Sequence, residues 1–220
     1  MSTATVHLLR HGEVYNPDRV LYGRLPEFHL SELGHEMAQR AAGYFLAQRE
    51  AGANITHLVS SPLVRAQETA EPTAKALGLD IVTDDRIIEA ANRFQGLSQI
   101  KQRLKEPKYW SYVVNPFRPS WGEPYRDQAE RMMTAIVEHR DRAVELGGDG
   151  AQAILVSHQL PIWVTRRSAE GKALWHDPRK RECTLTSVTS LDFEGESLVA
   201  VRYAEPSVDL LANAANIPGA

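Results

Sequence analysis

Apolar residues along the chain form short continuous runs, separated by longer segments in which they recur every three or four positions. Four of the runs predict buried strands, at residues 6–9, 55–59, 81–82 and 153–156. Two further runs, 187–193 and 198–203, flank the turn residues 194–196 and predict a hairpin.

Three segments with helical spacing lie between these runs. The first follows Ser31, a favourable N-cap residue, and places apolar side chains at regular positions as far as Phe45. The second is expected to begin at Ser61-Pro62, with the proline in the first turn, and to end at Gly78 in the left-handed conformation. The third spans residues 127–146 and ends before a pair of glycines.

This alternation of strands and helices favours an α/β fold, with a mostly parallel central sheet and helices on both faces. No internal repeat or low-complexity linker divides the chain, so we expect a single domain over residues 1–220. The patterning weakens from residue 205 onward, which is typical of a mobile tail.

The segment 90–123 has no clear period and is rich in proline and aromatic residues. Its aromatic side chains predict either a small satellite core beneath a long loop or a wall over a ligand site. The aromatic residues concerned are Tyr109, Trp110, Tyr112, Phe117 and Trp121.

The composition is that of a globular protein, with 43% hydrophobic and 24% charged residues among 220. A formal net charge of −3 argues against a nucleic-acid-binding protein, which would need a basic surface. The one cysteine, Cys183, can form neither an internal disulfide nor a four-thiolate metal site. The sequence shows no signal-peptide pattern and no long apolar run, so we expect a cytoplasmic protein without membrane contacts.

Polar and charged side chains follow each of the four single strands at the point where it ends. In mostly parallel sheets, ligands bind outside the carboxyl ends of the strands, so these side chains are expected at one edge. In chain order they are Arg10 and His11, then Ser61 and Arg65, then Glu89, then Ser157 and His158.

These residue types suit the transfer of a phosphoryl group. The guanidinium groups of Arg10 and Arg65 can clamp a phosphate through paired N–H bonds, and an imidazole such as His11 can attack phosphorus. The carboxyl group of Glu89 can protonate the leaving oxygen if burial raises its pKa. With His158 as a further cation, the chemistry needs no magnesium ion.

The same residues lie in motifs that resemble the histidine phosphatase superfamily, the phosphoglycerate mutase-like proteins. The motifs are R-H-G-E at residues 10–13 followed by Asn16, S-S-P-L-x-R-A-x-x-T-A at residues 60–70, Glu89, and S-H at residues 157–158. The resemblance covers residues 5–203, which is nearly the whole chain.

This resemblance implies a three-layer α/β/α sandwich, no cofactor, and a covalent intermediate on His11. It implies Glu89 as proton donor and His158 as part of the active site. The phosphate-binding groups that it implies are Arg10, Arg65, His158, Asn16 and the backbone N–H of Gln159.

Departures from the family pattern favour the small phosphatase branch over a mutase. Gln159 stands where a small residue is common, and no paired arginine lies between Glu89 and Glu123. We therefore expect a metal-independent phosphatase that acts on phosphomonoesters of small metabolites. The alternatives are a cofactor-dependent, mutase-type phosphotransfer and a non-catalytic protein that binds a phosphorylated ligand.

Some residues have competing interpretations. Arg24 could reach the substrate from the first loop or lie on the surface, and Asn16 could form a turn before Pro17. His7 and His11 have the spacing of metal ligands but no evident third partner, so no metal site is predicted. The expected partner is a phosphorylated small molecule, and the protein is expected to be a monomer or homodimer.

Overall fold

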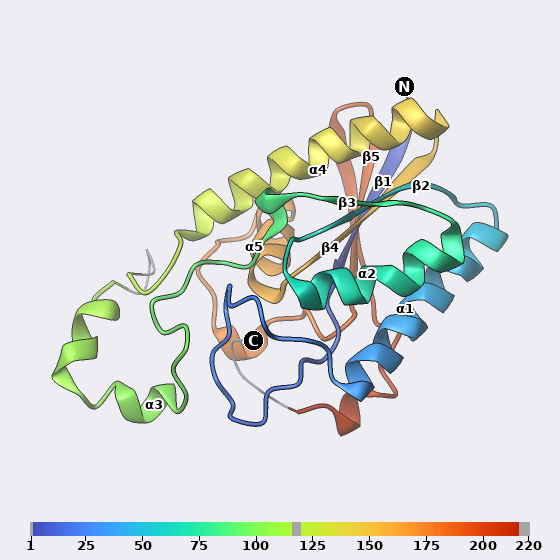
Figure 1. Ribbon diagram of the computed structural model, residues 1–220. Coiled ribbons are helices and arrows are strands. Elements are labelled where there is room, and N and C mark those ends of the chain that lie inside the picture. The colour runs from blue at the N-terminus through green and yellow to red at the C-terminus, as the bar shows by residue number, and fades with distance from the viewer. Residues whose placement is uncertain (1, 116–119, 216–220) are drawn as a thin grey trace.

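The computed structural model describes residues 2–115 and 120–215 and contains a six-stranded sheet in the order β3-β2-β4-β1-β5-β6 (Figure 1). The first four strands of that order run parallel, and β5 and β6 form the antiparallel edge. The strands are β1 (Thr3–Arg10), β2 (Asn54–Ser60), β3 (Ile81–Thr83), β4 (Ala151–Ser157), β5 (Val188–Glu194) and β6 (Ser197–Ala204).

Helices cover both faces of this sheet, which confirms the predicted α/β architecture. The helices α1 (Glu32–Glu50) and α2 (Val64–Leu77) pack on one face, and α4 (Tyr125–Gly147) and α5 (Gln159–Ala169) on the other (Figure 1). The four-residue helix α3 (Ile100–Arg103) lies away from the sheet.

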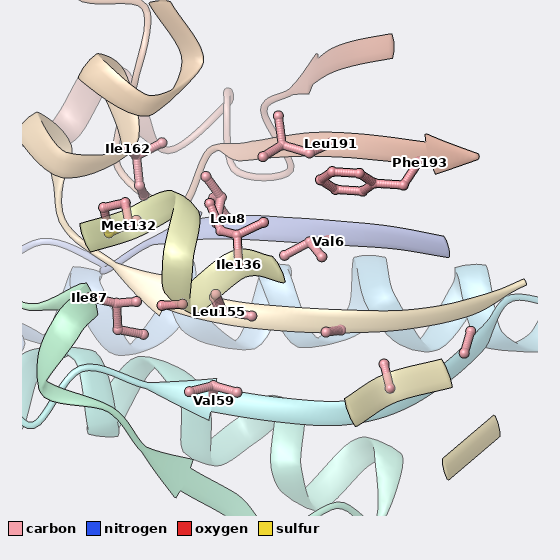
Figure 2. Close-up of a cluster of buried hydrophobic side chains, with 14 of the residues drawn as sticks. Val6, Leu8, Val59, Ile87, Met132, Ile136, Leu155, Ile162, Leu191 and Phe193 are labelled. Atoms are coloured by element: carbon pink, nitrogen blue, oxygen red, sulfur yellow. The ribbon is translucent and has the colours of Figure 1, made fainter. Parts of the chain in front are cut away.

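Each face of the sheet packs against its own hydrophobic core, which explains why the strands are apolar on both sides. Alternate residues of β1 divide between them: Leu8 packs beneath α4 and α5 with Met132 and Ile136, as Figure 2 shows, and Leu9 packs beneath α1 and α2 with Phe45. A central parallel strand buried on both faces is a continuous hydrophobic run rather than an alternating one. The polar residues at its end therefore mark where the core stops.

Two helices, α2 and α5, differ from the sequence prediction. Helix α2 begins at Val64, not at Ser61, and its N-cap residue Leu63 makes no side-chain cap. The Ser61 hydroxyl accepts the N–H of Leu63 at 3.4 Å, just before the helix, and also lies 2.7 Å from a nitrogen of His158. Helix α5 was not predicted at all, because its short apolar run does not distinguish a buried helix from a strand.

The segment 90–123, for which the sequence predicted no clear helix or strand, carries a small aromatic cluster. Phe94 is buried, and its ring centroid lies 6.1 Å from that of Tyr109 and 5.4 Å from that of Tyr112. Trp110 is exposed. Of the predicted aromatic set, Tyr109 and Tyr112 fit a satellite core around Phe94, the exposed Trp110 does not, and Phe117 lies outside the described residues.

Residues 205–215 are packed against the body of the protein. The side chain of Ser207 is buried, and its hydroxyl donates to the carbonyl oxygen of Met37 in α1 and bonds to Thr186. Leu210 is also buried. The part of the predicted tail from residue 216 lies outside the described residues.

Candidate active site

The parallel pairing of β1 with β4 brings the first and last motifs side by side. Arg10 pairs in register with Ser157, so His11 and His158 follow neighbouring positions at the same sheet edge. The backbone N–H of His11 donates to the Ser157 carbonyl at 3.1 Å, and the two histidine ring centroids lie 5.1 Å apart. On the other side of β4, the N–H of Ser61 donates to Val156 at 2.9 Å.

His11 has the geometry of a nucleophile. Its ring is fully buried, and Nδ1 lies 2.8 Å from the carbonyl oxygen of Gly12, so Nδ1 carries the hydrogen and donates it. Nε2 is then the atom with a lone pair, and it has no hydrogen-bond partner among the described residues. Burial, followed by the charges of Arg65 and Arg10, holds the pKa of His11 well below its usual value, so the ring is neutral.

Two glycines, Gly12 and Gly34, allow the chain to bring the carbonyl oxygen of Gly12 next to the His11 ring. A Cβ on Gly12 would lie 2.6 Å from the carbonyl oxygen of Gly34, and a Cβ on Gly34 would lie 2.0 Å from that of Glu13. The end of β1 and the start of α1 therefore approach more closely than any side chain would permit. The hydroxyl of Thr69 accepts the N–H of Gly12 at 3.1 Å and fixes the same turn from α2.

His158 faces His11 from the N-cap position of α5. Its Nε2 lies 2.7 Å from the Ser61 hydroxyl, and its buried Nδ1 has no partner among the described residues. Burial and the nearby Arg65 hold its pKa well below the usual value. The ring is therefore neutral rather than cationic as the sequence led us to expect, because it is buried beside cations.

Arg65 is the most deeply buried charge of the site. Its exposed fraction is 0%, and its NH2 group donates to the carbonyl of Gly23 at 2.5 Å. The guanidinium carbon lies 4.7 Å from the ring centroid of Tyr22, and its Nε has no partner among the described residues. Arg10 is also buried and donates from NH1 to the carbonyl of Cys183 at 2.8 Å. The two charges thus approach the histidines from different elements.

Glu89 is a buried carboxyl group close to these arginines. Its side chain accepts the N–H of Ala90 at 2.7 Å. Burial raises its pKa, although the Ala90 hydrogen bond and the charges of Arg65, Arg181 and Arg10 act in the opposite direction. A carboxyl group with a raised pKa can hold a proton near neutrality and donate it.

The remaining predicted residues have other contacts. Both polar groups of the Asn16 side chain bond to the backbone of Val20, at 2.8 Å and 3.0 Å, which is the turn-forming role. Gln159 begins α5, and its side-chain amide donates to the Cys183 carbonyl at 3.2 Å. Arg24 donates from Nε to the backbone carbonyl of Glu89 at 2.6 Å, so it lies beside the predicted site.

The sequence assigned no role to two charged residues that flank the site. Glu123 joins Arg24, at 3.0 Å, to Arg131 of α4, at 2.7 Å. Arg181 acts on the pKa of Glu89 from the segment before β5. Arg181 lies in a charged stretch far from the motifs, so no local pattern marks it.

The structure gives no support to a metal site at His7 or to a membrane span among the described residues. His7 contacts Ser190 at 2.8 Å and Gln152 at 2.9 Å, so both ring nitrogens are satisfied within the core. Within residues 2–115 and 120–215, no cluster of three or more metal-ligating side chains occurs. Across the same ranges, every helix is too short or too polar to span a bilayer.

Comparison with known proteins agrees with this geometry. A family model described as the histidine phosphatase superfamily (branch 1) matches residues 6–206. An uncharacterised protein of Mycobacterium tuberculosis is 48% identical over 204 residues, covering 92% of this chain and 96% of its own. A protein of Escherichia coli named "probable phosphoglycerate mutase" is 29% identical over 190 residues, covering 83% of each chain.

A solved structure resembles the fold over nearly its full length. It is a mycobacterial glucosyl-3-phosphoglycerate phosphatase, 26% identical, with a TM-score of 0.72. The alignment covers 92% of this chain and 98% of that one.

Proposed function

Because the chain belongs to the histidine phosphatase superfamily and is a phosphoric monoester hydrolase, we propose that it hydrolyses phosphomonoesters of small metabolites through a phosphohistidine on His11. The observation that carries this proposal is the state of the His11 ring. Its Nδ1–H is held by the carbonyl of Gly12, the ring is neutral, and the buried Nε2 beside two guanidinium groups has no partner among the described residues. A lone pair kept free in this way is available to attack phosphorus.

In the first step, the phosphoryl group binds between Arg10, Arg65 and His158. Nε2 of His11 forms a bond to phosphorus while the bond from phosphorus to the ester oxygen breaks. The protonated carboxyl group of Glu89 gives its proton to that oxygen, so an alcohol leaves. The arginines stabilise the charge that spreads over the transferred group, and the reaction needs no metal or cofactor.

In the second step, water replaces the alcohol. The Glu89 carboxylate takes a proton from water, the water oxygen bonds to phosphorus, and the bond between phosphorus and Nε2 breaks. Inorganic phosphate leaves, and both His11 and Glu89 return to their starting states. The raised pKa of Glu89 suits both roles, because the group must hold a proton in one step and take one in the next.

The mutase alternative has one observation in its favour, the name of the Escherichia coli relative. A mutase would return the phosphoryl group of His11 to a second substrate, and its turnover would depend on a bisphosphate primer. A ligand-binding protein without turnover would bind phosphate esters and release nothing. As further parts of this proposal, the partner is a phosphorylated small molecule, the location is the cytoplasm, and the chain is a monomer or homodimer.

The test is phosphate release in EDTA from a panel of phosphomonoesters that includes p-nitrophenyl phosphate and glucosyl-3-phosphoglycerate. His11→Ala is expected to lower kcat by at least about 10³, because the covalent route disappears. His35→Ala, at an exposed histidine of α1, is the matched control and should retain activity. Mass spectrometry of rapidly quenched enzyme should find a phosphoryl adduct on the His11 peptide.

Activity of the His11 variant within a few-fold of the wild type would contradict the covalent mechanism. Turnover only with a bisphosphate primer would replace the phosphatase with the mutase. Tight binding of phosphate esters without release of phosphate would replace both with the binding protein.

A further inference from the structure

A pair of buried histidines lies between α4 and β2. Nε2 of His57, from β2, is 3.0 Å from Nδ1 of His139, from α4, and the ring centroids are 5.1 Å apart. His57 shares a face of β2 with Val59, which belongs to the apolar core beneath α4. Apolar side chains could fill this space without burying polar atoms, so the pair calls for an explanation beyond packing.

The other nitrogen of His139 meets a carboxylate. Nε2 lies 2.9 Å from Oδ2 of Asp84, whose side chain is only 10% exposed. Burial alone would raise the pKa of Asp84, but hydrogen bonds from Arg86 and His139 outweigh it and lower the pKa to about 2, so the group is ionised. A carboxylate only accepts hydrogen bonds, so Nε2 of His139 carries a hydrogen and donates it, and Nδ1 is held by His57.

Asp84 begins the short segment that leads to Glu89. It is the N-cap of the 3₁₀ turn Asp85–Ile87, and its Oδ1 accepts the N–H of Arg86 at 2.7 Å. The turn ends at Ile87, which is buried in the core beneath α4. Glu89 follows two residues later, so the Asp84 carboxylate fixes the place from which the segment that carries Glu89 starts.

Three side chains of α4 reach this segment from one face of the helix, because Arg131, Glu138 and His139 are seven and eight positions apart. Arg131 donates to the carbonyl of Arg86, and Glu138 pairs with the guanidinium of Arg86 at 2.6 Å. The pair formed by Glu138 is exposed to water and screened by it, whereas the contact of His139 with Asp84 is buried. The histidine contact therefore holds the start of the segment where solvent does not compete.

We propose that His139, itself oriented by His57, positions the Glu89 carboxyl group by holding Asp84. The inference rests on the proposed function, in which Glu89 gives and takes the proton, and adds two positioning residues to it, one on α4 and one on β2. A proton donor must stay within hydrogen-bond reach of the leaving oxygen, and a misplacement of about 1 Å can cost on the order of 100-fold in rate.

Amide hydrogen exchange tests this hold without requiring turnover. His139→Leu should speed exchange of the peptide that covers residues 84–90 at least about ten-fold, because Asp84 loses a charged hydrogen bond and the segment opens more often. His139→Gln should restore most of the protection, because its side-chain amide can donate to Asp84.

Two other variants complete the comparison. Arg140→Gln is the matched control, because Arg140 is a buried polar residue of the same helix that pairs with Asp141 and lies over the ring of Phe193. It should leave exchange of residues 84–90 unchanged. His57→Leu should speed that exchange less than His139→Leu does, because it removes only the group that orients the ring.

Kinetics on two substrate types shows whether the hold serves proton transfer. In His139→Leu, kcat/KM for glycerol 3-phosphate should fall at least about ten-fold and kcat/KM for p-nitrophenyl phosphate less than about two-fold, because only the alkoxide needs a proton to leave. His139→Gln should recover most of the loss, and His57→Leu should show the same difference at smaller size. A variant that merely unfolds in part would lose activity equally on both substrates.

Unchanged exchange of residues 84–90 in His139→Leu would overturn the inference, and so would an equal loss of kcat/KM on the two substrates. If His139→Leu does not fold, the absence of both effects in His57→Leu would overturn it. Faster exchange in the variants of a protein without turnover on any phosphate ester would contradict the proposed function and keep the support of the segment by His139. Turnover by the wild type with unchanged exchange in the variants would do the reverse.

Discussion

The guanidinium of Arg24 holds the backbone of Glu89 through a hydrogen bond of 2.6 Å from Nε to the carbonyl oxygen. Its NH2 group bonds to Glu123 at 3.0 Å, and Glu123 in turn bonds to Arg131 of α4. The loop that carries Glu89 is therefore anchored to a helix on the α4 face of the sheet. We therefore expect Arg24 to position Glu89, because it bonds to the backbone of that residue.

Arg24→Gln should lower kcat about ten-fold for alkyl phosphates and much less for p-nitrophenyl phosphate. An alkoxide needs a proton to leave, and nitrophenolate does not, so a misplaced acid affects only the first kind of substrate. Steady-state kinetics on the two substrate types checks this. A loss of the same size on both types would show that Arg24 acts on phosphate binding instead.

Glu89→Gln should also affect alkyl phosphates more than p-nitrophenyl phosphate, and more strongly than Arg24→Gln does. The expected loss in kcat for alkyl phosphates is about 10²- to 10⁴-fold. Asp85→Asn, at an exposed carboxylate four residues earlier, is the matched control. The pH profile gives a second reading. Burial raises the pKa of Glu89, so wild-type kcat/KM for alkyl phosphates should decline as rising pH removes its proton.

That decline should be absent from the profile of Glu89→Gln, because no carboxyl group is left to titrate. The acid limb belongs to His11, whose pKa is lowered, so protonation of the nucleophile should lower activity only well below pH 6.5. An alkaline limb that persists in the variant would assign it to another group.

Gly34→Ala should destabilise the protein by about 1–3 kcal/mol, because the new Cβ would lie 2.0 Å from the carbonyl oxygen of Glu13. The strain falls on the turn that holds His11, so activity should fall as well. Gly43→Ala, in the same helix, is the control: a Cβ there meets nothing within 4 Å. It should be neutral or stabilise by up to about 1 kcal/mol, measured by urea unfolding.

A Gly34 variant as stable as Gly43→Ala would mean that the start of α1 can shift without cost. The close approach of α1 to β1 would then not be needed to hold the turn.

His7 should make stability depend on pH. Burial lowers its pKa from 6.5 to about 4, so the folded protein keeps this ring neutral while the unfolded chain binds a proton. Its contribution is complete above pH 6.5 and is lost as pH falls toward 4, by about 3 kcal/mol in total.

The variant His7→Gln should therefore lose less stability than the wild type over that range, although it should be less stable near neutrality. Urea unfolding at a series of pH values measures the difference. Parallel stability curves for the two proteins would show that other buried histidines cause the dependence.

Much of the site followed from the sequence because its residues lie at the ends of strands. The apolar run before Arg10 and the one before Ser157 had to be buried, and parallel strands place their carboxyl ends at one edge. That topology is enough to bring His11 and His158 together. Local chemistry also fixed the end of α2 at Gly78, with its φ of 60°, and the hairpin of β5 and β6.

Tertiary structure decided what the patterns do not encode. The Ser61 hydroxyl bonds to His158, and Arg24 bonds to the backbone of Glu89. Both partners lie dozens of residues away along the chain, and no local period records such a contact.

The sequence by itself thus determined the α/β architecture and the motif residues, since burial and strand direction depend on short stretches of side chains. Only the folded structure decided the protonation states, because burial of His11 and Glu89 beside cations sets their pKa values. It also decided the pairing of His139 with Asp84, because α4 and the segment before Glu89 lie far apart along the chain and meet only in the fold.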